Sequence, residues 1–252
     1  MDLQLSGAHV LVTGGTRGIG RAIVEGFLDE GAAVAFCARD PEEVSATQQA
    51  LGDRGTVTGT SVDVGDAEAL AAWVDQCADA FGGLDVVVAN VSALAIPDTE
   101  ENWQASLNVD LMHTVRLVRA ALPHLERSGS ASIIAISSVS GRESDFASGP
   151  YGTAKTAIIG YIHGLAMQLA DRGIRANTVS PGNTYFEGGV WASIESGDPD
   201  LFKTAVELNP TGHMGTPEEV AGPVIFLASP LARRISGTNL VMDGALTRGI
   251  QL

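Results

Sequence analysis

The sequence predicts an α/β protein with a doubly wound parallel sheet of about seven strands. The main indication is a series of short, continuous apolar runs that alternate with amphipathic stretches along the whole chain. Continuous runs of this length fit strands that are buried on both faces, as in a parallel sheet. A glycine-rich segment directly after the first run is the second indication. The runs are Val10–Val12, Val34–Phe36, Val57–Thr58, Val86–Val88, Ile133–Ile136, Thr178–Val179 and Leu240–Val241.

Helical patterns fill the intervals between these runs. In the segment Tyr151–Arg172, apolar residues recur every three or four positions, which is the period of an amphipathic helix. Asp66 and Thr216 are residue types that cap helix N-termini, and each precedes a predicted helix. Strands and helices in this order are joined by right-handed crossovers in one sheet, so we expect a single domain over residues 1–252. The predicted helices are Ile19–Glu30, Ala67–Phe81, Trp103–Leu125, Tyr151–Arg172 and a helix that begins at Pro217.

Composition and charge exclude several classes of protein. With 252 residues, 45% of them hydrophobic and 18% charged, the chain can bury a large core and is not a disordered protein. The net charge of −15 disfavours nucleic acid and membrane surfaces as partners. The two cysteines, Cys37 and Cys77, are too few for a disulfide framework, and the five histidines show no metal-binding spacing, so no metal is expected. No secretory signal and no apolar run of eighteen residues is visible, which predicts a soluble, cytoplasmic protein.

Residues 182–215 interrupt the alternation of strands and helices. The segment is punctuated by Gly, Asp and Pro, yet it carries Tyr185, Phe186, Trp191 and Phe202. An irregular insertion of this length is usually functional. We expect a lid with some short helix over a pocket, in which Tyr185 and Trp191 contact substrate. A flap that faces another subunit is the alternative interpretation.

The segment Thr13–Gly20 lies between the first predicted strand and the first predicted helix. A sharp turn at this place requires glycine, and the close approach of a pyrophosphate requires bare backbone. Free backbone amides and the helix dipole then attract the phosphates. The segment therefore predicts a dinucleotide-binding loop. Its candidate binding residues are Gly14, Thr16, Arg17, Gly18, Ile19 and Gly20.

Tyr151 and Lys155 are the predicted centre of catalysis. They lie four residues apart near the start of a predicted helix, so their side chains share one face. A phenol is a poor proton shuttle at neutral pH, but a nearby ammonium stabilises its phenolate form. Tyr151 can then act as general acid in carbonyl reduction and as general base in alcohol oxidation. Only two of the fifteen basic residues are lysines, which makes a lysine at this spacing more informative.

With these motifs in this order, the chain resembles the short-chain dehydrogenase/reductase family over almost its entire length, and in particular the 3-oxoacyl-acyl carrier protein reductase branch. The Gly-x-x-x-Gly-x-Gly spacing of the loop and the Tyr-x-x-x-Lys pair carry the resemblance. It implies a Rossmann-type fold and a nicotinamide cofactor. It also implies two more catalytic residues. Ser138, thirteen residues before Tyr151, would donate to the carbonyl oxygen, and Asn108 would hold a water for a proton relay from Lys155.

The resemblance also implies further contacts with the cofactor. Asn90 matches the family's Asn-Asn-Ala-Gly motif, although the sequence here reads Ala-Asn-Val-Ser. A threonine position that is common in the family after its Pro-Gly motif is occupied by Phe186, which leaves Thr184 as the candidate for the carboxamide contact. The implied cofactor residues are Asp63, Val64, Asn90, Tyr151, Lys155, Pro181, Gly182 and Thr184.

The end of the second strand decides between NADP(H) and NAD(H). An acid there would accept hydrogen bonds from a ribose 2′-hydroxyl and repel a 2′-phosphate. The resemblance puts this position at Ala38, with Arg39 next to it and Arg17 inside the loop. Two guanidinium groups suit a 2′-phosphate, so NADP(H) is favoured. NAD(H) stays possible because Asp40 could bend back to a ribose.

We therefore expect an NADP(H)-dependent oxidoreductase that interconverts a small ketone and a secondary alcohol by hydride transfer. A 3-oxoacyl-[acyl-carrier-protein] reductase is one alternative, for which Arg119, Arg127 and Arg172 would form a local patch for the acidic carrier. A nucleotide-sensing regulator without chemistry is another, although relatives of that kind typically lose the tyrosine or the lysine. The family also implies a homo-oligomer, a tetramer or a dimer, which pairs through the helices predicted at Trp103–Leu125 and Tyr151–Arg172.

Overall fold

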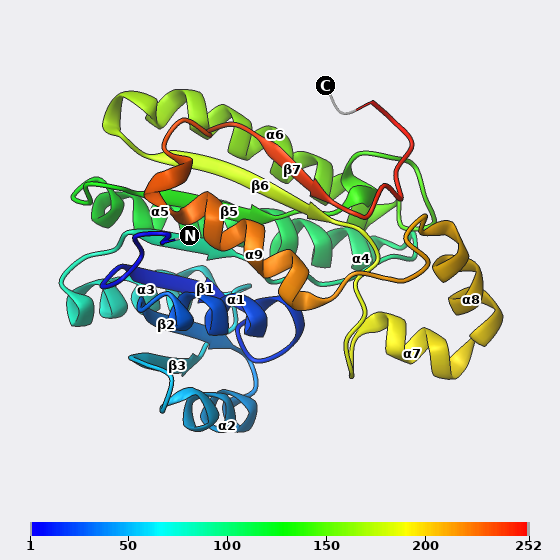
Figure 1. The fold of residues 1–252 in the computed structure, drawn as a ribbon, viewed down its shortest axis with the longest axis horizontal. Coiled ribbons are helices and arrows are strands. Elements are labelled where there is room, and N and C mark those ends of the chain that lie inside the picture. Colours follow the sequence, from blue (N-terminus) through cyan, green and yellow to red (C-terminus); the bar gives the residue numbers. More distant parts are fainter. Residues whose placement is uncertain (1, 251–252) are drawn as a thin grey trace.

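A computed structural model describes residues 2–250, and its centre is a seven-stranded sheet in which every pair of neighbours is parallel. The strand order is β3-β2-β1-β4-β5-β6-β7 (Figure 1). This arrangement confirms the predicted Rossmann-type α/β fold. The strands are β1 (His9–Thr13), β2 (Ala33–Ala38), β3 (Val57–Ser61), β4 (Val86–Ala89), β5 (Ser132–Ile136), β6 (Arg175–Pro181) and β7 (Asn239–Met242).

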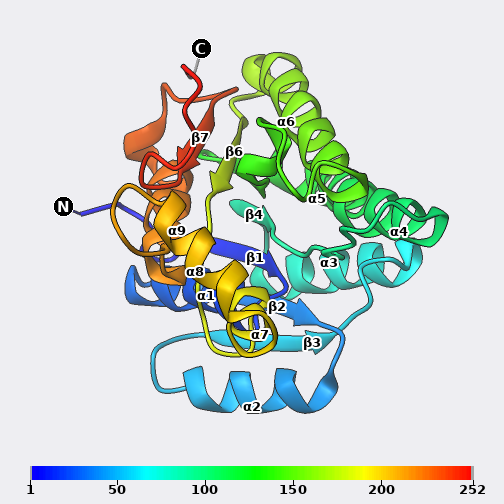
Figure 2. The ribbon, with the colours of Figure 1, turned by 90° about the vertical axis from the view of Figure 1, so that its right-hand side faces the viewer.

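Helices cover both faces of the sheet (Figure 2). One hydrophobic core lies between the sheet and α1, α2 and α9, and the other between the sheet and α3, α5 and α6. The helices are α1 (Gly18–Asp29), α2 (Pro41–Leu51), α3 (Ala67–Phe81), α4 (Glu100–Ala105), α5 (His113–Leu125), α6 (Pro150–Leu169), α7 (Val190–Gly197), α8 (Pro199–Leu208) and α9 (Pro217–Ala228). No helix within residues 2–250 combines the length and apolar character that a membrane crossing requires.

The apolar strands divide their side chains between the two cores. In β1, Val10 and Val12 belong to the core under α1, and Leu11 belongs to the core under α3. Successive side chains of a strand point to opposite faces, so a strand covered on both faces, such as β1 or β4, is apolar at nearly every position. This is why short continuous apolar runs identified the strands.

The order in which strands are added to the sheet changes side between β1 and β4. Strands β2 and β3 follow on one side of β1, whereas β4 to β7 follow on the other. At such a switch point the loops leave the sheet in opposite directions, and a crevice forms at the carboxyl ends of the strands. The hairpin of α7 and α8 projects beyond this same edge (Figure 1).

Two of the predicted helices differ in detail from the structure. The predicted helix Trp103–Leu125 is divided into α4, a π-helical segment at Ser106–Met112 and α5. The other helix ends at Leu169 and continues as one 3-10 turn to Arg172. The Thr216 cap is present, and its side chain forms a capping box with Glu219 at the start of α9. The π-helical segment is the difference that matters for the site, because it changes which side chains face inward.

We predict that Phe36→Ala lowers the free energy of unfolding by about 3–5 kcal/mol. The Phe36 side chain is fully buried, and its ring packs so closely under the chain that a Cβ added at Gly59 would lie 2.6 Å from it and one added at Gly15 would lie 2.9 Å from it. Urea denaturation followed by circular dichroism measures the effect. Phe146→Ala is the control, because that ring is 64% exposed; an equal loss of stability in both variants would contradict the assignment.

Candidate active site

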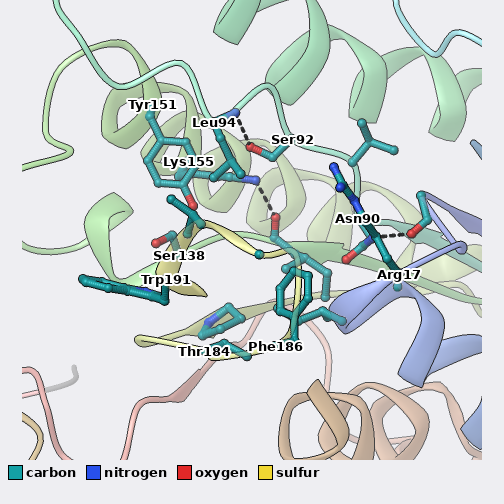
Figure 3. A pocket seen from close by; sticks show the side chains of 18 of the residues that line it. Arg17, Asn90, Ser92, Leu94, Ser138, Tyr151, Lys155, Thr184, Phe186 and Trp191 are labelled. Carbon is teal, nitrogen blue, oxygen red and sulfur yellow. Dashed lines mark hydrogen bonds between the residues drawn. The ribbon is translucent and has the colours of Figure 1, made fainter. Parts of the chain in front are cut away.

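A cavity of about 560 Å³ lies at the carboxyl edge of the sheet. The loops after β1, β2, β4, β5 and β6 line it, together with the start of α6 and the inner side of α7 (Figure 3). Its walls include the predicted dinucleotide loop, at Gly14 and Gly20, and the predicted catalytic residues Tyr151 and Lys155. The predicted cofactor and catalytic groups therefore share one cavity.

The backbone of the glycine-rich loop has the shape that a phosphate cradle requires. Gly14 and Gly18 have φ angles of +74° and +52°, a region that favours glycine. A Cβ added at Gly20 would lie 1.9 Å from the Gly14 carbonyl oxygen, so only glycine permits this close turn. Because α1 begins at Gly18, its free amides and dipole point at the same cavity. These features fit a dinucleotide pyrophosphate.

Asn90 braces this loop from the end of β4. Its side-chain amide donates to the carbonyl oxygens of Thr13 (3.1 Å) and Gly14 (3.2 Å), and its backbone N–H donates to Thr13 Oγ1 (3.0 Å). The predicted cofactor residue Asn90 therefore lines the cavity and also fixes the loop's shape.

Charged side chains surround the far end of the cavity, where β2 ends. Arg17 and Arg39 are exposed, line the cavity and have no ion-pair partner within residues 2–250. Asp40 also lines the cavity, and its Oδ1 accepts from the backbone N–H of Glu42 (2.8 Å) and caps α2. Glu43 lines the cavity as well and accepts from the Thr16 hydroxyl at 3.1 Å. Two free guanidinium groups fit a 2′-phosphate.

The Lys155 side chain runs through the protein beneath the cavity and is only 2% exposed. Its Nζ donates to the carbonyl oxygen of Ile136 at 3.1 Å and lies 5.5 Å from the centroid of the Tyr151 ring. Figure 3 shows Tyr151, Lys155 and Ser138 grouped in the same cavity. The predicted catalytic tyrosine and lysine are therefore neighbours in the structure.

Ser138 and its neighbour Ser137 have different roles. The Ser138 oxygen accepts from the Ser140 backbone N–H at 3.2 Å, so its own hydroxyl hydrogen stays available for donation. The Ser137 hydroxyl donates to the carbonyl oxygen of Lys155 at 2.9 Å and anchors α6. Ser138 is thus the serine that can serve a substrate oxygen.

The Asn108 side chain forms its hydrogen bonds with residues other than Lys155. The Asn108 amide donates to the Gly65 carbonyl oxygen at 3.4 Å, and its oxygen accepts from Arg116 at 2.7 Å. The residue that faces Lys155 is Asp110, whose Oδ1 lies 3.3 Å from Lys155 Nζ. In the π-helical segment the Asn108 side chain thus faces Arg116 and the Asp110 side chain faces Lys155, and the water-holding role of Asn108 stays a prediction.

The remaining predicted residues divide into two groups. Asp63 accepts from the Gly65 backbone N–H at 2.8 Å and does not line the cavity, and Tyr185 donates to Glu195 at 2.6 Å and packs edge-on against Phe202 instead of entering it. The residues that line the cavity as predicted are Thr16, Ile19, Val64, Pro181, Gly182, Thr184 and Trp191.

Two residues that line the cavity, Phe146 and Phe186, and one buried residue beside Lys155, Asp110, were not predicted as site residues. Asp110 has no pattern that would distinguish it from its neighbours. Phe146 meets Trp191 edge to face at a centroid distance of 6.1 Å across the cavity. The Phe186 ring lies against the loop, since a Cβ added at Gly18 would be 2.5 Å from it. The sequence signal available for Phe186 was its place among the aromatic residues of the predicted lid.

A dinucleotide cradle and a tyrosine–lysine pair in one cavity define a nicotinamide-dependent oxidoreductase of the Rossmann type. A family model described as Enoyl-(Acyl carrier protein) reductase matches residues 14–247. The chain belongs to the short-chain dehydrogenase/reductase family, and it is an NAD(P)-dependent oxidoreductase that acts on a CH–OH group or the corresponding carbonyl.

Similar proteins extend over nearly the whole chain. The isoepoxydon dehydrogenase patN of Penicillium expansum is 40% identical over 98% of this chain and 97% of its own length. The 3-oxoacyl-[acyl-carrier-protein] reductase FabG of Vibrio cholerae is 33% identical over 97% of this chain and 99% of its own. L-Sorbose reductase from Gluconobacter frateurii, in complex with NADPH and L-sorbose, has a TM-score of 0.92 and 27% identity, and covers 99% of this chain and 100% of its own.

We predict that Gly20→Ala weakens NADPH binding by about tenfold or more, because the added methyl group would displace the Gly14 carbonyl and the Asn90 amide. Titration of NADPH fluorescence measures the dissociation constant. Gly222→Ala makes the same chemical change in α9, where a Cβ has open space, and serves as the control. Normal binding by the Gly20 variant would contradict the cradle.

Proposed function

We propose that the protein is an NADP(H)-dependent oxidoreductase that interconverts a small ketone and a secondary alcohol, with Tyr151 as general acid and base. The observation that carries the proposal is the buried Lys155 ammonium, 5.5 Å from the Tyr151 ring centroid, in the same cavity as the glycine-rich loop.

Each residue of the site has a separate role in the proposed reaction. A bound nicotinamide supplies or accepts the hydride. Tyr151 gives its proton to the carbonyl oxygen in reduction and removes the hydroxyl proton in oxidation. The Ser138 hydroxyl donates to the same oxygen as negative charge develops on it. Lys155 stabilises the phenolate that Tyr151 becomes when it gives up its proton.

NADP(H) is the favoured cofactor. Arg17 and Arg39 leave two guanidinium groups beside the position expected for the ribose 2′-phosphate, and Asp40 uses its Oδ1 to cap α2. The presence of NADPH in the structure of L-sorbose reductase supports the same cofactor. Glu43 keeps NAD(H) as the alternative, because it is the one carboxylate besides Asp40 that lines this end of the cavity within residues 2–250.

The substrate part of the cavity suits a small, largely apolar molecule. Its walls include the apolar side chains of Leu94, Ile96, Phe146, Trp191 and Ile194. Two of the similar proteins are named for small molecules, isoepoxydon and L-sorbose. We include α7 and α8 in this proposal as the lid over the substrate.

An acyl carrier protein is the second candidate substrate carrier, favoured by the similarity to FabG. The arginines expected to form its docking patch are partly neutralised, since Arg172 pairs with Glu126 at 2.7 Å. Arg127 donates to the Pro123 carbonyl oxygen at 2.7 Å and to His124. A free small molecule therefore remains the favoured substrate. A homo-oligomer and a cytoplasmic location complete the proposal, and light scattering tests the first.

We predict that Tyr151→Phe lowers kcat by roughly 100-fold or more and leaves NADPH affinity within about twofold, because only the proton donor is removed. Steady-state kinetics on a panel of ketones and alcohols measure the loss. Tyr161→Phe, on the same helix, is the matched control and should keep its activity. Full turnover by the Tyr151 variant would disprove the proposed mechanism.

We predict that Arg39→Gln raises the dissociation constant of NADPH about tenfold and leaves that of NADH within about twofold, since a charge-assisted bond to the 2′-phosphate is lost. Fluorescence titration with both cofactors measures the difference. Arg54→Gln, which removes a guanidinium paired with Asp29 away from the cavity, is the control. An equal loss for both cofactors would show that Arg39 does not contact the phosphate.

A further inference from the structure

Lys155 has a charged partner that the proposed mechanism does not use. Its Nζ lies 3.3 Å from Asp110 Oδ1, and Asp110 is fully buried. The same ammonium donates to the Ile136 carbonyl oxygen and lies near the Tyr151 ring. One buried positive charge therefore faces both a carboxylate and the phenol that it is proposed to activate.

The π-helical segment holds Asp110 in this position. Asp110 Oδ2 accepts from the Ala93 backbone N–H at 3.3 Å. Asp110 Oδ1 has no hydrogen-bond partner within residues 2–250, and its contact is the ion pair with Lys155. Oδ2 therefore fixes the carboxylate to the loop after β4, and Oδ1 faces the Lys155 ammonium.

No other acid shares this role. Within residues 2–250, Asp110 supplies the one carboxylate within 4.0 Å of Lys155 Nζ. His113 of α5 is fully buried, and burial, with a contribution from the Lys155 charge, lowers its pKa to about 3, so it is neutral. Arg116, also of α5, is bound to Asn108 and Gly65.

The other elements around the pair add no charge to it. Strand β5 and the segment 89–96 after β4 contain no charged residue, and β1 ends in Thr13. The acids of α4, Glu100 and Glu101, are exposed. Asp145 lines the cavity, but it accepts from the Ser140 hydroxyl at 2.6 Å.

We propose that Asp110 is a positioning residue that holds the Lys155 ammonium and offsets part of its charge, so that Tyr151 keeps its proton to a higher pH. The proposal rests on the proposed function, in which Tyr151 is the general acid and base. An ammonium alone favours the phenolate, and a carboxylate in contact with that ammonium weakens its effect. The protonated phenol is the form that reduces a carbonyl, so the pair favours reduction at neutral pH.

The test is Asp110→Asn, which keeps the shape and removes the charge. Without the carboxylate the phenolate is more stable, and Tyr151 loses its proton at lower pH. The rise of alcohol oxidation with pH and the fall of ketone reduction with pH should both move to lower pH, by about one unit. The control is Ser106→Ala, a buried residue of the same π-helical segment, whose profile should not move. An unchanged profile for Asp110→Asn, or a shift to higher pH, overturns the proposal.

A second measurement separates this proposal from the proposed function. The ultraviolet absorbance of tyrosinate, taken as the difference between each protein and its Tyr151→Phe counterpart, follows the titration of Tyr151 without turnover. If Tyr151→Phe stays active, the proposed function fails, whereas the absorbance titration still decides whether Asp110 acts on Tyr151. If Asp110→Asn does not fold, as judged by thermal melting and NADPH binding, Asp110→Ser is titrated in the same way. Failure of both variants to fold assigns the pair to stability alone and overturns the proposal.

Discussion

The geometry of the site depends on one constraint, the burial of the Lys155 ammonium away from water. Lys155 is 2% exposed, and a buried charge costs free energy unless polar partners compensate for it. The partners come from separate elements: the Ile136 carbonyl from β5 and the Asp110 carboxylate from the π-helical segment. The start of α6 adds the Tyr151 ring. These elements must therefore meet at one point, and a compact ammonium fits there better than the broad, planar guanidinium of arginine.

The parallel sheet makes this meeting possible without long loops. Val12 of β1 is paired in register with Val88 of β4, so Thr13 and Asn90 emerge beside each other at the carboxyl edge. Hydrogen bonds between Asn90 and the glycine-rich loop join the two strands at that point. Ser138 follows β5 at the same edge. The cofactor cradle and the proposed catalytic groups thus share a rigid frame, and their relative positions depend on strand register instead of on mobile segments.

The sequence predicted the frame better than the details of the site. Strands that are apolar at every position and helices of regular period are local patterns, and the predicted α3, Ala67–Phe81, agrees with the structure residue for residue. The π-helical segment was not predictable in this way, because one wider turn leaves the apolar pattern of Trp103–Leu125 intact while it places Asp110 at Lys155. The helix cap formed by Asp40 depends likewise on the local backbone geometry at the start of α2. In both cases the pattern of residue types does not distinguish the contact that forms from the alternatives.

The Phe186 ring lies between the proposed cofactor part of the cavity and its proposed substrate part. A Cβ added at Gly18 would lie 2.5 Å from its ring, and one added at Gly189 would lie 2.9 Å from it, so the ring is held between the dinucleotide loop and the base of α7 (Figure 3). Side chains at either glycine would push the ring away, which explains why glycine occupies both positions. Because the ring touches the loop on one side and the segment that leads to Trp191 on the other, a displacement of α7 changes the packing over the loop. The proposed lid and the proposed cofactor site are for this reason parts of one packed unit, joined by the Phe186 ring.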